Sequence, residues 1–149
     1  MTRLTILPLA DGLTVSAQPG IADFSDLAAL GVTLVVNDRP DGEEPDQLSA
    51  ADAGGIARAN GMDYRHIPVK LTEISAADVT AFGQAVADAT GPVHAHCRTG
   101  IRAATLWALN EVMSGRKSAD EVQATIQRAG FDPKTAHAWL AAHAVPTPP

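Results

Sequence analysis

Hydrophobic residues along the chain occur either in short continuous runs or at helical spacing, and Gly, Pro and Asp separate these segments. Short continuous runs are typical of buried strands, whereas apolar residues at i, i+3 and i+4 are typical of helices. The pattern predicts strands over residues 4–7, 13–17, 32–36, 64–69 and 93–96. It predicts helices over residues 22–30, 49–60, 75–90, 102–113, 119–129 and 133–144, followed by a frayed tail over 146–149.

Capping residues support several of these helix boundaries. Ser75 with Asp78, and Ser118 with Glu121, have the spacing of a capping box, in which each side chain bonds the other residue's backbone N–H. Asp132-Pro133 predicts an N-cap followed by a proline at the first helical position. Ala10-Asp11-Gly12 between the first two strands predicts a hairpin.

The order of the later elements is strand, helix, strand, helix, strand, helix, which favours an α/β fold. Such a chain forms a mostly parallel central sheet with helices on both faces, because each helical crossover returns the chain to the end of the sheet where the previous strand began. A length of 149 residues fits one domain over 1–149. Ligands of such sheets bind at the carboxyl ends of the strands, so the residues that follow each strand are the candidates for chemistry.

Charge and cysteine content narrow the class of function. A net charge of −6 argues against nonspecific binding to nucleic acid or acidic membranes, which needs a broad basic surface. Cys97 is the only cysteine, and the first residues are too briefly apolar for a secretory signal. No apolar stretch has the length of a membrane span. We therefore expect a cytoplasmic protein.

The most informative segment follows the strand over 93–96, where Cys97 begins a short loop that ends at Arg102 and a helix. A helix N-terminus offers unpaired backbone N–H groups and the positive end of the helix dipole, which favour a thiolate and bind oxyanions. We expect Cys97 to be the nucleophile and Arg102 to clamp an anion. The residues expected to line the oxyanion-binding loop are Arg98, Thr99, Gly100 and Ile101.

Other polar residues near this loop allow two interpretations each. His94, His96 and Cys97 could suggest a metal site, but core histidines bonded to backbone fit the same spacing, and we expect His96 to support the loop. Arg39 either contacts the ligand or pairs with Asp41 or Glu43. Residues 41–44 are most simply an exposed acidic loop.

Four ordered motifs in the chain resemble the DUF442 family, the phosphatase-like domain also called beta-lactamase hydrolase-like. They are LTVSAQP at 13–19, VNDRPDGEE at 36–44, YRHIPV at 64–69 and GPVHAHCRTGIR at 91–102. The match covers about residues 3–112 and leaves out the helices predicted over 118–144. The resemblance implies a fold similar to dual-specificity protein tyrosine phosphatases, activity as a cysteine phosphatase or sulfurtransferase, and no metal or organic cofactor.

The chain departs from the phosphatase pattern at three positions. Four residues separate Cys97 from Arg102, whereas those enzymes have five, and the shorter spacing is that of the rhodanese active loop. Ala103 stands where phosphatases use a hydroxyl beside the arginine, and Leu71 stands where dual-specificity enzymes commonly carry the acid that protonates the leaving oxygen.

Three functions are consistent with these residues. A phosphatase would act on small-molecule or protein phosphomonoesters, preferably aryl phosphates, through a thiophosphoryl-cysteine, with Asp38, Asp41 or Glu73 as the acid. A rhodanese-like sulfurtransferase would carry a persulfide on Cys97 between a sulfane-sulfur donor and an acceptor thiol. A catalytically weak pseudo-enzyme would bind oxyanions without turnover.

Overall fold

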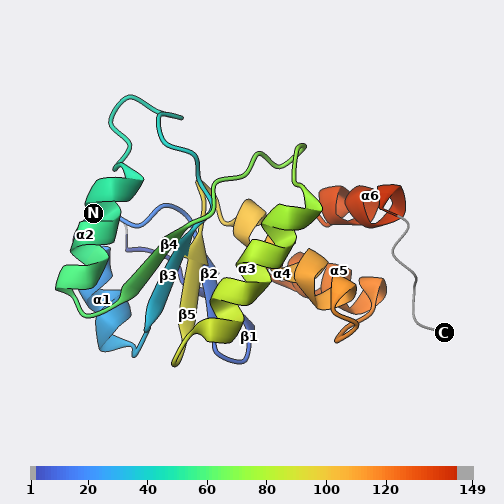
Figure 1. The fold of residues 1–149 in the computed structure, drawn as a ribbon, viewed down its shortest axis with the longest axis horizontal. Coiled ribbons are helices and arrows are strands. Elements are labelled where there is room, and N and C mark those ends of the chain that lie inside the picture. The colour runs from blue at the N-terminus through green and yellow to red at the C-terminus, as the bar shows by residue number, and fades with distance from the viewer. Residues whose placement is uncertain (1–2, 144–149) are drawn as a thin grey trace.

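The computed structural model describes residues 3–143, and within them a five-stranded sheet has the order β1-β2-β5-β3-β4 (Figure 1). The strands are β1 (Leu7–Ala10), β2 (Leu13–Ser16), β3 (Leu34–Asn37), β4 (Asp63–His66) and β5 (Val93–His96). β1 pairs antiparallel with β2, and every other pair is parallel. The predicted mostly parallel sheet is therefore confirmed.

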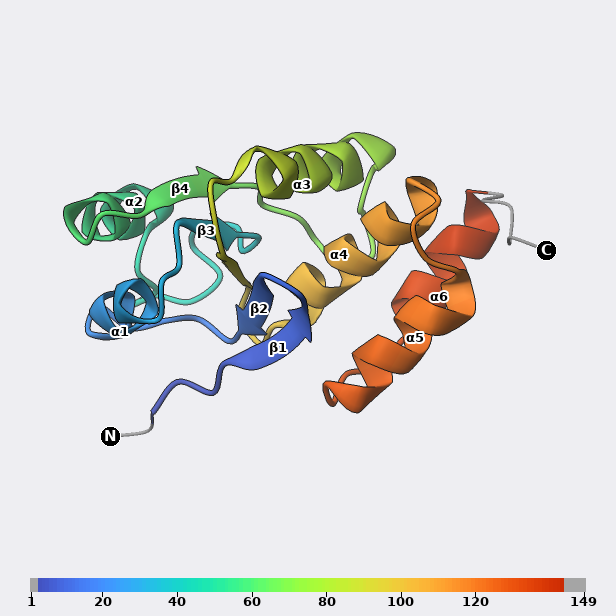
Figure 2. The same cartoon turned by 90° about the horizontal axis from the view of Figure 1, so that it is seen from below.

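Helices cover both faces of this sheet. They are α1 (Asp23–Ala29), α2 (Ala50–Ala59), α3 (Ala76–Asp88), α4 (Ile101–Met113), α5 (Ala119–Arg128) and α6 (Lys134–Ala142). Figure 2 shows α1 and α2 on one face and α3 and α4 on the other, with α5 and α6 packed outside α4. None of the helices within residues 3–143 has the length and apolarity that a membrane crossing requires.

Two hydrophobic cores hold the layers together. Val35 faces a smaller core under α1 and α2 with Phe24 and Leu27, whereas Val36 faces a larger core under α3 and α4. This alternation follows from the strand period of two. α4 is buried on nearly every side, as its apolar sequence predicts, because it lies between α3 and the pair formed by α5 and α6.

The predicted capping boxes are present at two helix starts. The Ser75 hydroxyl accepts from the Asp78 N–H, and the Ser118 hydroxyl accepts from the Glu121 N–H. Each acidic side chain returns a bond to the serine backbone. Because these bonds are local in sequence, the starts of α3 and α5 were predictable within a residue.

The first strand lies later than predicted, at Leu7–Ala10 rather than 4–7. The reason is the tight turn at Asp11-Gly12, where Gly12 has φ +75° and Ala10 pairs directly with Leu13. A hairpin this short extends pairing up to the turn. Pro8 is tolerated because β1 is an edge strand, where a missing N–H costs no bond to a second neighbour.

Other boundaries also differ from the prediction, among them β3, which runs over Leu34–Asn37 rather than 32–36. β4 ends at His66 rather than at residue 69, because the chain turns at Pro68 and Val69 then bonds to Asp38 beyond the end of β3. α6 begins at Lys134, one residue late, although the Asp132 carboxylate still accepts from the Lys134 N–H. Residue 144 and the predicted tail over 146–149 lie outside the described residues.

Two buried histidines on β5 are held neutral. His94 bonds through both ring nitrogens, to Thr14 Oγ1 and to Ser16 Oγ, each at 2.7 Å. Burial lowers the pKa of His94 to about 4 and that of His96 to about 3. Each ring therefore gains a proton on unfolding wherever the pH lies between the folded pKa and the ordinary value of 6.5.

This arrangement predicts that the free energy of unfolding falls as the pH drops below about 6.5, by up to about 1.4 kcal/mol per pH unit for each histidine. His94→Gln should flatten the dependence between about pH 6.5 and 5, as measured by urea unfolding at a series of pH values. His137→Gln, at an exposed position on α6, is the control and should leave the slope unchanged. Equal slopes in wild type and His94→Gln would contradict the assignment.

Candidate active site

Cys97 follows β5 directly, at the carboxyl edge of the sheet and before the N-terminus of α4. Its side chain is fully buried. The backbone N–H groups of Gly100 and Arg102 donate to Cys97 Sγ, at 3.0 and 3.3 Å. Two such donors and the positive end of α4 stabilise negative charge on the sulfur. The loop over 97–102 thus directs the backbone N–H groups of Gly100 and Arg102 at the sulfur.

Gly100 allows this loop to close. Its φ of +107° belongs to the left-handed region, and a Cβ there would lie 2.9 Å from Phe131 Cζ and 3.3 Å from the carbonyl oxygen of Ser16. Only glycine combines that backbone conformation with that close approach. The loop is therefore fixed between β2 and the segment that leads to α6.

Arg102 is held by contacts from two distant segments. Its Nη1 donates to the carbonyl oxygen of Val69 at 3.1 Å, and Nη1 and Nη2 donate to the two carboxylate oxygens of Glu43, both at 2.8 Å. Hydrogen bonds from Arg102 and Arg39 lower the pKa of Glu43 to about 2. A bidentate carboxylate of this kind fixes the guanidinium plane, so Glu43 acts as a positioning residue for Arg102.

The sequence predicted an exposed acidic loop over residues 41–44 and Glu43 as one possible partner of Arg39, but it did not predict the contact between Glu43 and Arg102. The Glu43 side chain is 29% exposed and lies between two arginines, whereas Asp41 accepts from the Ala50 N–H at the start of α2. Residues 41–44 are exposed, as expected, and Glu43 in addition pairs with Arg39 and Arg102. Glu43 and Arg102 are 59 residues apart, and no local spacing connects them.

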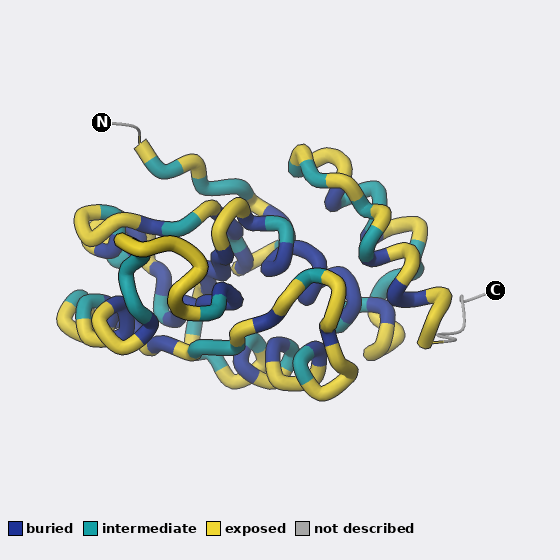
Figure 3. Tube along the Cα trace, turned by 90° about the horizontal axis from the view of Figure 1, so that it is seen from above, coloured by how far each residue is buried: buried dark blue, intermediate teal, exposed yellow. Residues whose placement is uncertain are grey.

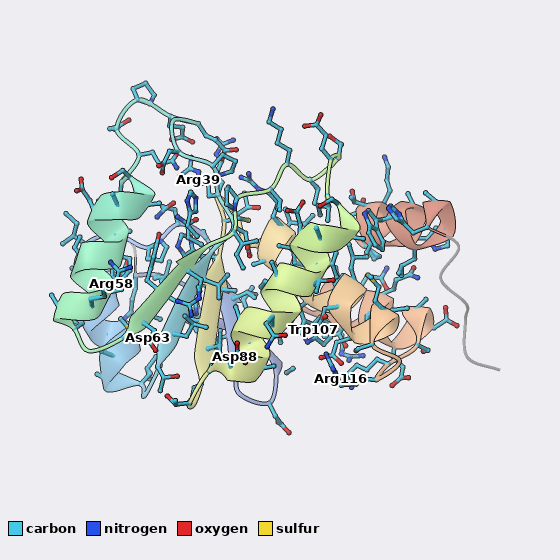
Figure 4. The ribbon with its side chains drawn as sticks, viewed as in Figure 1. Arg39, Arg58, Asp63, Asp88, Trp107 and Arg116 are labelled. Atoms are coloured by element: carbon cyan, nitrogen blue, oxygen red, sulfur yellow. The ribbon has the colours of Figure 1, made fainter. Side chains whose placement is uncertain are left out.

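Arg39 and Arg98 lie on the same side of the site and share a second carboxylate. Arg39 is buried and pairs with Glu43 through Nε at 2.9 Å, which agrees with one of the two partners expected for it, and its Nη2 lies 3.3 Å from Glu44 Oε1. Arg98 Nε bonds the same Glu44 oxygen at 2.8 Å. Figure 4 shows Arg39 near the carboxyl end of the sheet, below the loop that leads to α2. Figure 3, which looks onto this edge, shows that this loop is exposed.

Asp38 is the only one of the three expected acids that is buried beside Cys97. Its backbone N–H donates to the His96 carbonyl at 2.8 Å, and its carbonyl accepts from the Val69 N–H at 3.1 Å. Neither carboxyl oxygen has a hydrogen-bond partner among the described residues. Burial first, and then the negative charge of Cys97, raises the pKa of Asp38 well above its ordinary value, against the opposing charge of Arg102. The protonated carboxyl is therefore favoured.

The other two expected acids make different contacts. Asp41 caps α2, and Glu73 is 67% exposed and lies 3.8 Å from the ammonium of Lys70. Within residues 3–143, no hydrogen bond or ion pair joins either carboxylate to the cysteine loop. Their contacts favour structural roles for both.

The remaining loop residues are placed as follows. His96 Nδ1 lies 3.4 Å from the carbonyl oxygen of Cys97, and Thr99 Oγ1 lies 3.5 Å from the Ile101 N–H. No group of three or more His, Cys, Asp or Glu side chains in the described part of the chain is arranged to hold a metal ion. Ala103 is fully buried, and Leu71 packs against the larger core.

A parallel sheet whose central strand delivers a cysteine to an amide-lined loop before a buried helix defines the class of phosphatase-like α/β domains of the tyrosine phosphatase type. The chain belongs to the family described as Beta-lactamase hydrolase-like protein, phosphatase-like domain, whose sequence model matches residues 6–114. A Beta-lactamase hydrolase-like protein of Agrobacterium fabrum is 45% identical over 128 residues, which are 86% of this chain and 30% of that protein. The chain spans about a third of the length of the curated relatives that it matches.

Solved structures support the same fold. A candidate phosphatase from Neisseria meningitidis Z2491 has a TM-score of 0.82 and 33% identity, and the match covers 92% of this chain and 96% of that one. TpbA of P. aeruginosa, in a cysteine-to-serine form in complex with phosphotyrosine, has a TM-score of 0.67 and 19% identity, over 91% of this chain and 86% of that one. At that identity the likeness concerns the fold alone.

The geometry of the loop predicts that Gly100→Ala destabilises the protein more than Gly115→Ala. Gly115 also has a positive φ, of +76°, but a Cβ there would meet nothing within 4 Å. Gly115→Ala should therefore cost only the backbone strain of about 1–2 kcal/mol. Gly100→Ala should cost about 1–3 kcal/mol more, because Phe131 and the Ser16 carbonyl must move. Urea unfolding of both variants measures the difference, and equal losses would contradict this role for Gly100.

Proposed function

We propose that the chain is a cysteine-dependent phosphatase for phosphomonoesters, with Cys97 as the nucleophile. The observation that carries the proposal is the pair of backbone N–H groups that donate to Cys97 Sγ, next to a guanidinium held in place by Glu43. The loop N–H groups and the positive end of α4 suit a group that carries several anionic oxygens. The phosphotyrosine bound to TpbA, which has the same fold, also supports a phosphomonoester substrate.

In the first step the Cys97 sulfur attacks phosphorus in line with the leaving oxygen. The S–P bond forms as the P–O bond breaks, and Arg102 with the loop N–H groups stabilises the equatorial oxygens. In the second step the oxygen of a water molecule attacks phosphorus, and the S–P bond breaks. Inorganic phosphate leaves, and the thiolate of Cys97 is restored.

Asp38 is the group that we assign to proton transfer. Burial raises the pKa of its carboxyl and so favours the protonated form beside the sulfur, which can give a proton to the leaving oxygen in the first step. The resulting carboxylate then takes a proton from the attacking water, and the resting state returns. A protonated Asp38 also leaves Cys97 as the only negative charge at the floor of the loop, which avoids repulsion between the two groups.

Sulfur transfer is the second candidate, because the spacing of four residues between Cys97 and Arg102 is shorter than that of tyrosine phosphatases. In that reaction the Cys97 thiolate attacks the outer sulfur of a donor such as thiosulfate, the S–S bond of the donor breaks and sulfite leaves. An acceptor thiolate then attacks the outer sulfur of the Cys97 persulfide, which transfers that sulfur and restores the Cys97 thiolate. No leaving oxygen needs a proton, so Leu71 in place of an acid has no consequence for this reaction.

The deciding experiment compares both reactions in one preparation. We expect hydrolysis of 4-nitrophenyl phosphate and phenyl phosphate, inhibition by orthovanadate, and complete loss in Cys97→Ser. Mass spectrometry after exposure to thiosulfate should show no stable gain of one sulfur on Cys97. A persulfide without hydrolysis would replace the proposal by sulfur transfer. Tight vanadate binding with neither reaction would leave an oxyanion-binding pseudo-enzyme.

The role of Asp38 predicts that Asp38→Asn lowers kcat on phenyl phosphate by about 100-fold or more, with a smaller loss on 4-nitrophenyl phosphate. The difference arises because the nitrophenolate leaves without protonation. In wild type, kcat on phenyl phosphate should fall as the pH rises through the raised pKa of Asp38, and the variant should lack this limb of the pH profile.

Asp26→Asn, on the exposed side of α1, is the matched control and should retain the wild-type rate on both esters. A larger loss of kcat on phenyl phosphate than on 4-nitrophenyl phosphate in Glu73→Gln, but not in Asp38→Asn, would contradict the assignment of Asp38 as the acid.

A further inference from the structure

A cavity of about 550 Å³ lies beside the cysteine loop and is lined by residues from three segments of the chain. Arg98 belongs to the cysteine loop itself, directly after Cys97, and its side chain is 63% exposed. Arg39 and Glu44 come from the segment between β3 and α2, and residues 18–21 come from the segment between β2 and α1. The cavity adjoins Arg98, the residue directly after the nucleophile, so we consider it as a subsite for the part of a substrate beyond its phosphate.

Two guanidinium groups in this cavity converge on one carboxylate oxygen of the chain. Arg98 Nε and Arg39 Nη2 lie 2.8 and 3.3 Å from Glu44 Oε1. Arg39 Nη2 is buried and makes no hydrogen bond of good geometry within the described residues, so part of its donor capacity is unused. The Glu44 side chain is 47% exposed. A carboxylate on an exposed loop thus occupies a position that another anion could take.

The rest of the cavity wall is partly apolar and also includes Gln18, Gln47 and Asp46. Ile21 is 66% exposed, and Pro19 and Leu48 line the same space. An apolar wall beside two guanidinium groups suits an aromatic or aliphatic body that ends in an anionic group.

We propose that this cavity is a second anion subsite, which selects phosphomonoesters that carry a carboxylate or a further phosphate on the leaving group. Arg98 and Arg39 bind the second anion, and Glu44 is the internal carboxylate that it displaces. The inference rests on the proposed phosphatase function and adds the class of substrate to it. It requires that substitutions of Arg98 and of Glu44 change the preference for a charged substrate in opposite directions, because Arg98 binds the substrate anion and Glu44 competes with it.

The test uses the phosphate esters of 3-(4-hydroxyphenyl)propanoate and of its carboxamide. Two methylene groups separate the varied group from the ring, so the two phenols are nearly equal leaving groups and differ in charge. We expect wild-type protein to prefer the carboxylate in kcat/KM. Arg98→Ala should reduce the preference by about 3- to 10-fold, a range set by the partial exposure of this charge pair. Glu44→Gln should increase the preference by about 3-fold, mainly through a lower KM.

Arg116→Ala is the matched control. Arg116 is also an exposed arginine that pairs through Nε with a glutamate, Glu111, and it lies at the opposite end of the sheet from Arg39 (Figure 4). This variant should leave the preference unchanged. A phosphotyrosine peptide with Glu at the next position, compared with the same peptide with Gln, shows whether an acidic peptide or a small acid is the better source of the second anion. A charge preference in either pair supports the subsite where Arg98→Ala reduces it.

The outcomes separate the two proposals. Equal kcat/KM for the charged and neutral members of both pairs, with hydrolysis intact, overturns the subsite and leaves the phosphatase in place. Losses of the same size on both members in Arg98→Ala would assign Arg98 a structural role and also overturn it. If wild-type protein hydrolyses none of these esters, the phosphatase proposal fails, and the subsite fails with it.

Discussion

The position of β5 between β2 and β3 is the constraint on which the site depends. Parallel pairing on both sides fixes the end of β5, and Cys97 follows immediately. The neighbouring strands end at the same edge, so the residues after β2 and β3 reach the cysteine loop. Backbone hydrogen bonds join these segments: the Gln18 N–H donates to the carbonyl of Arg98, and the Asp38 N–H donates to the carbonyl of His96. With the sulfur fixed, the turn at Gly100 and the start of α4 can direct N–H groups at it.

Arginines and carboxylates near the sulfur form a network of ion pairs. Two arginines, Arg102 and Arg39, share Glu43, and the exposed Arg98 joins the network through Glu44. Beneath this network Asp38 is buried without a partner among the described residues, an arrangement that costs folding free energy whenever the carboxyl is ionised. Such costs are common where a site needs a group of unusual proton affinity, and rare where packing alone decides the residue.

Local chemistry explains why so much of the fold was predictable. The capping boxes of α3 and α5, the turn at Gly12 and the continuous apolar run of β5 each involve residues close in sequence. The cysteine loop belongs to the same group, since strand, loop and helix are contiguous. Strand ends were less predictable. β1 extends as far as its turn and β4 as far as its pairing with β3, and neither limit depends on the strand's own residues alone.

From its residues alone, the chain specifies an α/β fold, a cysteine at the end of a buried strand and a helix that begins next to it. It does not specify the partner of Arg102, because an ion pair across 59 residues depends on the path of the whole chain. Nor does it distinguish Asp38 from Asp41 and Glu73. The three side chains have similar chemistry in water, and the burial of Asp38 beside Cys97, which raises the pKa of its carboxyl, depends on the tertiary structure.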